Sequence, residues 1–276
     1  MNGRLEVVIL GCGSSGGVPR ADGNWGACDP RDQRNARTRC SLMVRRRSQS
    51  GEGGEETTII VDAAPELRLQ SAAAGIKRLD GVCLTHDHAD QVHGIDDIRA
   101  FFLKQKKRIP CWMDATTEAA MRRRFAYMFD GAPGPYPAIA DIEGAQIGDR
   151  WRIEGPSGAI PVAVFDQDHG ATRSLGYRFG PVAYSSDVVD LPEESFAALQ
   201  GVGVWIVDAL RFTPHPTHAH VDKTLAWIEK VRPARAILTN LHIDLDYATL
   251  AARLPAGVEP AYDGLRFEVE LAGAYG

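Results

Sequence analysis

The sequence predicts an α/β fold in which two β-sheets pack face to face with helices on the outside. Two stretches of the chain are rich in short apolar strands, and each also carries segments with helical spacing. The 276 residues, 44% hydrophobic and 24% charged, suffice to bury one such core. Neither a linker nor an internal repeat divides the chain. We therefore expect a single domain over residues 1–276.

The predicted strands are short runs of apolar and β-branched residues bounded by glycine, proline or polar residues. They cover residues 5–10, 40–46, 57–61, 81–84, 151–153, 160–165, 174–179, 182–185, 204–207 and 236–239. A Gly-rich loop at residues 11–19 follows the first strand and allows the backbone to approach a ligand closely. Residues 48–56, rich in Gly, Ser and Glu, predict a mobile hairpin connection.

The predicted helices have apolar residues at helical spacing between recognisable start and stop signals. They cover residues 62–74, 96–104, 116–128, 224–231 and 247–253. In the first of them, Pro65 suits the first turn and Gly75 ends the helix. The glycines and prolines of residues 131–137 break the chain between the two strand-rich stretches.

The strongest chemical signal follows the strand at residues 81–84. His86, His88 and Asp90 fall within five residues, so a turn there can direct three side chains toward one point. Imidazole nitrogens and a carboxylate oxygen are the ligands of zinc-type sites that keep positions open for water and substrate. The alternative is a polar surface turn with incidental histidines, but only 8 of the 276 residues are histidine.

Further residues of the same chemical kind end other predicted strands. His169 and Asp187 end two of them, and a polar group from Asn240 to His242 ends a third. Each motif alone is weak, but together with residues 86–91 they resemble the metallo-β-lactamase superfamily, in family order. The resemblance implies a four-layer αββα sandwich with a metal site at the rim between the sheets.

The resemblance also implies the roles of the individual residues. It places His86, His88 and His169 around a first metal ion, makes Asp187 the carboxylate that bridges two metals, and makes Asp90 a ligand of the second. Two positions that carry histidine in the family hold Gln91 and Asn240 in this chain.

Both departures weaken the same metal site. Amide oxygens are weaker zinc ligands than imidazole, so the second site should bind zinc less well or prefer a harder ion such as manganese. His242, two residues after Asn240, could replace the missing ligand or could be a nearby loop histidine, and the sequence leaves both readings open. We expect one or two divalent metal ions, zinc or manganese.

Within the superfamily, the chain resembles the phosphodiesterase branch. That branch includes the tRNA 3′-processing endonuclease and the cyclic-phosphate phosphodiesterase of the carbon–phosphorus lyase pathway, and the loop at residues 13–19 looks like that of the latter. His220, directly before a predicted helix, matches a histidine that assists the leaving group there. The alternative is that the histidines of this stretch are solvated and only cap the helix. Arg37 or Arg39 would neutralise phosphate oxygens.

Charge and cysteine usage limit the partners. A net charge of −5 and a pI of about 5.9 argue against an extended nucleic-acid surface but allow a small phosphorylated substrate. No apolar run is long enough to span a membrane. Five widely spread cysteines indicate reduced thiols and a cytoplasmic protein. Whether two chains form a homodimer stays open.

The expected activity is that of a metal-dependent phosphodiesterase acting on a small phosphodiester or cyclic nucleotide. A metal-bound hydroxide would attack the phosphorus, with Asp90 orienting the water and His220 assisting the leaving group. One alternative is a catalytically weak nucleotide- or metal-binding module, motivated by Gln91 and Asn240. Another is a hydrolase of a different ester class, such as a lactone or a thioester.

Overall fold

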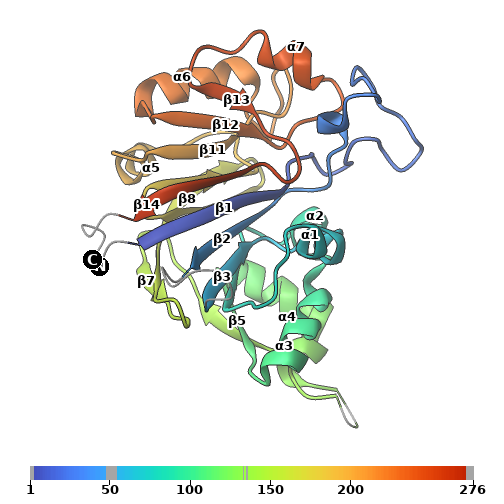
Figure 1. The fold of residues 1–276 in the computed structure, drawn as a ribbon, viewed down its shortest axis with the longest axis vertical. Helices are drawn as coiled ribbons and strands as arrows, with labels where there is room; N and C mark the ends of the chain where they lie inside the picture. The colour runs from blue at the N-terminus through green and yellow to red at the C-terminus, as the bar shows by residue number, and fades with distance from the viewer. Residues whose placement is uncertain (1–2, 48–54, 133, 135, 272–276) are drawn as a thin grey trace.

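The computed structural model describes residues 3–47, 55–132, 134 and 136–271, and it contains two seven-stranded sheets stacked face to face (Figure 1). The first sheet consists, in spatial order, of β14 (Arg266–Leu271), β1 (Gly3–Gly11), β2 (Ser41–Arg47), β3 (Glu56–Val61), β4 (Gly81–Cys83), β5 (Ile109–Met113) and β6 (Ala140–Gly144). The second consists of β13 (Val258–Pro260), β12 (Arg235–Thr239), β11 (Val204–Asp208), β10 (Val182–Ser185), β9 (Thr172–Phe179), β8 (Ile160–His169) and β7 (Arg150–Ile153).

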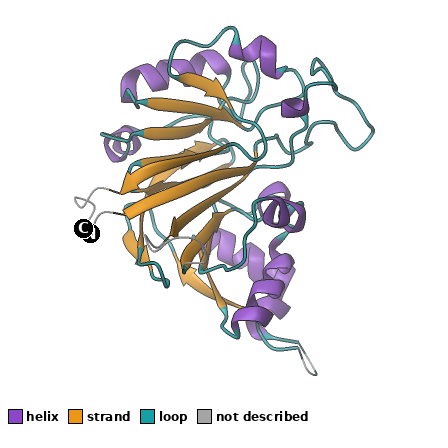
Figure 2. Cartoon of the chain, in the orientation of Figure 1, coloured by secondary structure: helices purple, strands orange, loops and turns teal. Residues whose placement is uncertain are grey.

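Helices cover the outer faces of the two sheets (Figure 2). The first sheet is covered by α1 (Leu67–Ala73), α2 (Ala89–Val92), the 3-10 turn η2 (Ile95–Ile98), α3 (Arg99–Gln105) and α4 (Ala115–Asp130). The second is covered by α5 (Glu193–Ala198), α6 (Val221–Val231) and α7 (Tyr247–Ala251). The predicted sandwich of two sheets between helical layers is therefore confirmed.

The alternation of side chains along each strand builds this layered core. In β1, Leu5, Val7 and Ile9 pack between the two sheets, whereas Val8 and Leu10 face the helices. Successive residues of a strand point to opposite faces, so a strand that is apolar throughout can fill two core layers at once.

Two of the strands that lead into polar residues, β4 and β11, run parallel to both neighbours, whereas β8, which ends at His169, is antiparallel to β7 and β9. β4 pairs in parallel with β3 and β5, and β11 pairs in parallel with β10 and β12. Carboxyl ends of parallel strands meet at one edge of a sheet, which is the usual place for a ligand site in an open α/β sheet. The loops after these strands therefore lie together at the rim of the sandwich.

Most predicted elements are present, with informative differences. The first helix begins at Leu67 rather than near Asp62, because Asp62 takes a positive φ of 62° and the chain turns there. The predicted helix at residues 96–104 is a 3-10 turn followed by α3. Strands β5, β6, β13 and β14 and helix α5 had no sequence prediction. The hairpin connection expected at residues 48–56 lies largely outside the described residues.

Across the described ranges, no helix has both the length and the apolar character needed to cross a membrane.

Gly94 provides a test of how the segment between β4 and α3 is packed. Its N–H donates to the Ala63 carbonyl at 2.9 Å, and a Cβ at Gly94 would lie 1.9 Å from the Ala64 carbonyl oxygen. Since backbone cannot move away as a flexible side chain can, Gly94→Ala should lower the free energy of unfolding by at least ~2 kcal/mol in urea denaturation. Gly144→Ala, where a Cβ meets nothing within 4 Å, is the matched control and should change it by less than ~0.5 kcal/mol. Equal effects of the two substitutions would contradict this packing.

Candidate metal centre

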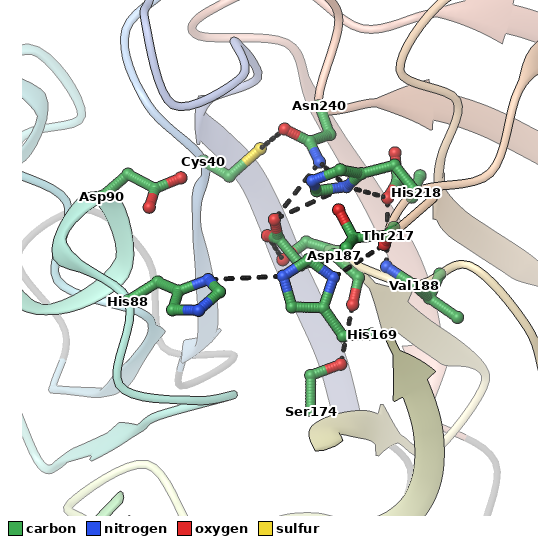
Figure 3. A network of polar contacts seen from close by, with 12 residues as sticks. Cys40, His88, Asp90, His169, Ser174, Asp187, Val188, Thr217, His218 and Asn240 are labelled. Atoms are coloured by element: carbon green, nitrogen blue, oxygen red, sulfur yellow. Dashed lines mark hydrogen bonds and ion pairs between the residues drawn. The ribbon is translucent and has the colours of Figure 1, made fainter. Parts of the chain in front are cut away.

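Three of the predicted ligands converge at the rim of the sandwich. His86 and His88 follow β4 of the first sheet, and His169 ends β8 of the second. Their ring centroids are 4.4, 4.9 and 5.1 Å apart, and their candidate ligand atoms lie within 4.8 Å of one another. Figure 3 shows His88 and His169 reaching toward each other from opposite sides. His88 is exposed, so the group is open to solvent.

Hydrogen bonds at Nδ1 orient the rings of His86 and His169, so that the other ring nitrogen of each points toward the other imidazoles. His169 Nδ1 lies 2.7 Å from the Thr217 carbonyl, which only accepts, so Nδ1 carries the proton. Thr85 Oγ1 bonds both oxygens of Asp62 at 3.0 Å and the Nδ1 of His86 at 2.9 Å. A hydroxyl has one proton, which the Asp62 carboxylate takes, so His86 Nδ1–H donates to Thr85.

This pattern passes a direct test for a cation site. His86 Nε2 is buried and has no hydrogen-bond partner, although buried polar atoms are normally satisfied. It lies with His88 and with His169, whose Nδ1 donates to the Thr217 carbonyl. Burial lowers the pKa of His86 to about 3, so its ring is neutral as a ligand must be. Three imidazoles with carboxylates nearby suit zinc or a similar divalent ion.

The segment between the two histidines is clamped from α4. Arg124 donates through Nη2 to the Asp87 carboxylate at 2.8 Å and through Nη1 to the Asp87 carbonyl. Asp87 separates His86 from His88, so this clamp fixes the turn that carries two of the three imidazoles. The sequence offered no signal for this contact, since Arg124 belongs to a basic run typical of a solvated helix face.

Asp187 lies beside the three imidazoles and is nearly completely buried. Its Oδ2 accepts from Gln91 Nε2 at 2.9 Å and from Ser186 Oγ at 3.0 Å. With His169 and His218 it forms a second group whose candidate ligand atoms lie within 4.8 Å. Burial alone would raise the pKa of Asp187, but the neighbouring histidines, His218 foremost, outweigh burial and lower it.

The two amides that replace family histidines both contact Asp187. Gln91 Nε2 also donates to Asp90 Oδ2 at 3.1 Å, and Asn240 Nδ2 donates to Asp187 Oδ1 at 3.4 Å. Donors that face the carboxylates offer no lone pair to a second cation. Burial, followed by the charge of Asp187, raises the pKa of Asp90 to about 6.

His218, which had no assigned role in the sequence, is the histidine that the structure brings to this group. Its Nδ1 lies 2.8 Å from Asp208 Oδ2 and 3.7 Å from Asp187 Oδ1. His220, two residues on, precedes the first turn of α6, and its side chain makes no capping hydrogen bond. Only Ala219 separates His218 from His220 in this loop, so the tertiary packing rather than the local sequence distinguishes them.

The remaining expected ligand, His242, lies outside both groups. Its Nε2 is 2.5 Å from Arg20 Nη2, and its Nδ1 is 2.9 Å from Asp244 Oδ2. Sequence reasoning had left it as either a ligand or a loop histidine, and its contacts favour the second.

The two arginines expected to bind phosphate are engaged elsewhere. Arg37 is only 2% exposed and donates to Asn35 Oδ1 at 3.1 Å and to the His242 carbonyl at 3.4 Å. Arg39 pairs with Glu66 at 2.8 Å. The expected substrate contact of Arg37 is therefore corrected, because its guanidinium holds loops together inside the protein.

A cavity of about 570 Å³ lies on the outer face of β7–β9, away from these residues. Its lining contains no histidine, cysteine or carboxylate, so it cannot hold the metal. The chemistry of the rim, rather than the volume of a cavity, identifies the site.

Comparison with known proteins identifies the family of the chain. Residues 57–243 match the family model described as the beta-lactamase superfamily domain, and the chain belongs to this family. A crystal structure described as a new diphosphatase from the PhnP family is similar over 98% of this chain and 99% of its own, with 30% identity and a TM-score of 0.84. The predicted superfamily is thus confirmed.

Two further similarities say less about the function of this chain. Zinc-bound PqqB from Methylobacterium extorquens shares the fold, with 18% identity, a TM-score of 0.69 and coverage of 95% of this chain and 99% of its own. An octanoyltransferase of Porphyromonas gingivalis (strain ATCC BAA-308 / W83) is 27% identical over 273 residues, which is 98% of this chain and 52% of that protein. The chain thus spans about half the length of this relative, so the name assigns no activity to the shared part.

The contacts of Gln91 and Asn240 predict unequal metal binding. Protein purified in limiting zinc should hold close to one ion, because amide donors face the carboxylates of the second site. The double substitution Gln91→His with Asn240→His should raise the zinc content toward two per chain, measured by elemental analysis after mild chelation. Two tightly held ions in the unchanged protein would contradict this reasoning.

The pKa of His218 gives a second test, made on the metal-free protein. Burial lowers this pKa, but Asp208 outweighs burial and raises it to about 9. A raised pKa stabilises the folded state below the unfolded value of about 6.5, and this stabilisation is lost as the pH rises through 9. NMR titration should find His218 protonated at pH 7.5, and Asp208→Asn should lower its pKa. A normal His218 titration near 6.5 would refute the pairing.

Proposed function

We propose that this protein is a metal-dependent hydrolase of small phosphate esters, most simply a phosphodiesterase. The observation that carries the proposal is the group of three imidazoles, with the buried His86 Nε2 unpartnered, next to the ion pair of His218 and Asp208. A cation site and a protonated imidazole at one rim provide the two things that phosphate ester hydrolysis needs. The similar structure described as a diphosphatase extends the proposal to phosphoanhydrides.

A divalent cation held by His86, His88 and His169 would supply Lewis acidity and water of lowered pKa. The chain's own residues account for the other parts of the reaction. Asp90 is a carboxylate whose raised pKa of about 6 makes it a better proton acceptor than an ordinary aspartate, suited to orient the attacking water.

In this proposal, His218 protonates the leaving group. Asp208 engages Nδ1, which leaves the other ring nitrogen to donate a proton to the departing oxygen. Asp208 itself accepts from the Val188 N–H at 3.0 Å, so the imidazole is held from behind. This is the role that the sequence had given to His220.

Acyl transfer is the activity named for the octanoyltransferase relative, but the thiols of this chain do not support a covalent cysteine mechanism. All five cysteines are buried, and burial raises the pKa of Cys40, the thiol nearest Asn240, well above its usual range. An acyl-accepting thiol must be accessible and readily ionised. Lactone or thioester hydrolysis by the metal centre stays as the second candidate activity.

We also propose a cytoplasmic location, supported by five free cysteines.

Turnover of bis(p-nitrophenyl) phosphate with added zinc or manganese tests the proposal. The protein should hydrolyse it, and His88→Ala should lose both most of the bound metal and the activity. His93→Ala is the control for removing a histidine, since His93 is exposed and packs against Phe125. Metal binding without turnover of any phosphate ester would instead indicate a binding module.

His218→Ala tests the proton donor. It should retain the first metal and slow cleavage of esters with poor leaving groups by about 10²–10⁴-fold, the usual range for general acid catalysis. Esters of p-nitrophenol need little protonation and should suffer much less. A leaving-group-dependent loss in His220→Ala instead would return the role to His220.

A further inference from the structure

Arg20 has an unusual partner for an arginine. Its Nη2 lies 2.5 Å from Nε2 of His242, and a guanidinium can only donate, so this ring nitrogen accepts. Across the ranges 3–47, 55–132, 134 and 136–271, no carboxylate forms an ion pair with Arg20. The side chain is only partly exposed. Its positive charge is therefore held in place but not neutralised.

A backbone turn and two side-chain contacts fix the position of Arg20. The backbone turns tightly around it, with Arg20 N–H donating to Asn24 O at 2.9 Å and Gly23 N–H donating to Arg20 O at 2.8 Å. The side chain crosses Gly16, where a Cβ would lie 2.9 Å from Arg20 Nη1. The second side-chain contact is the one between the guanidinium and His242 Nε2.

His242 is in turn held as an acceptor. Its Nδ1 is 2.9 Å from Asp244 Oδ2, although the carboxylate lies outside hydrogen-bonding direction, so this contact is electrostatic. A carboxylate next to Nδ1 favours the proton there and leaves Nε2 free to accept from Arg20.

The loop connections place His242, the partner of Arg20, close to the rim of the metal centre. His242 follows two residues after Asn240, which contacts Asp187, and two residues span at most about 7–8 Å between Cα atoms. The His242 N–H donates to Leu210 O at 3.0 Å, and the Leu210 N–H donates to Ala219 O at 2.9 Å, in the loop that carries His218.

We propose that Arg20 is a substrate-binding residue for a second anionic group, a phosphate that neighbours the phosphate being cleaved. A guanidinium matches phosphate with two parallel hydrogen bonds, and one without a carboxylate partner needs no ion pair broken first. The substrate class is therefore a phosphodiester or phosphoanhydride that carries a further phosphate. This inference rests on the proposed function of the metal centre.

Two probes separate the second phosphate from the reaction itself. ADP carries two neighbouring phosphates, whereas bis(p-nitrophenyl) phosphate carries one. In Arg20→Ala, kcat/KM for ADP should fall at least tenfold more than kcat/KM for bis(p-nitrophenyl) phosphate, with the loss mainly in KM, as expected for removing a hydrogen bond to a charged group. Arg20→Lys should recover part of the loss.

Two further variants serve as comparisons. Gly16→Ala keeps the charge but displaces the guanidinium, and it should reproduce part of the selective loss. Arg31→Ala is the matched control, since Arg31 lies in the same loop, has a side chain that is 88% exposed and pairs with Asp29. It should change neither substrate's kinetics.

Binding of α,β-methylene-ADP to the metal-loaded protein, followed by calorimetry, decides the proposal without turnover. Affinity should fall at least tenfold in Arg20→Ala and stay unchanged in Arg31→Ala. Equal affinity in wild type and Arg20→Ala, or no wild-type binding at millimolar concentration, would overturn the second-phosphate site. Binding that depends on Arg20 in a protein that cleaves no phosphate ester would overturn the proposed function and leave the site intact.

Discussion

The buried negative charge at the rim is the constraint on which the site depends. Asp187 and Asp208 are almost fully inaccessible, and Asp90 is largely covered. A buried carboxylate is stable only when hydrogen bonds or positive charge replace the lost water. Ser186, Gln91 and His218 supply part of this compensation to Asp187. A cation held by the neighbouring imidazoles would supply the rest, which explains why metal and carboxylates share one place.

The same constraint is visible in the backbone. Five non-glycine residues of the described chain have positive φ, and three of them, Asp62, Asp187 and Asn240, directly follow or lie just beyond strands at the rim. The other two end helices, where this conformation is common. A left-handed non-glycine residue needs support from its surroundings and recurs at functional sites. At each of the three residues, the positive φ turns the backbone so that a polar side chain points toward the site.

In one half of the site, the structure brings together residues that the sequence had named as candidates. His86, His88 and Asp90 lie close together in the sequence, and His169 and Asp187 lie at strand ends that the apolar pattern predicts. Two of the four strands that sequence reasoning missed, β6 and β14, have alternating or largely exposed residues and lack a continuous apolar run. Strong local periodicity therefore accounts for what could be predicted of the fold.

The other half depends on contacts between distant loops, which no local pattern encodes. His218 and His220 have similar sequence surroundings, yet only His218 meets Asp208, ten residues earlier in the chain. Arg37 and Arg20 are both loop arginines, yet one is buried against Asn35 and the other contacts His242. Burial and partner, rather than residue type, decide whether an arginine supports the fold or is available to an anion.

The amides at positions 91 and 240 have a chemical consequence for the whole site. Two imidazoles in their places could hold a second cation, which would neutralise both Asp187 and the oxygen that leaves the phosphate. With amides there, the positive charge next to Asp187 comes from His218, whose raised pKa Asp208 maintains. A proton can be transferred to a leaving oxygen, whereas a cation can only stabilise its charge. A site built in this way should therefore favour substrates with poor leaving groups, because these gain most from protonation.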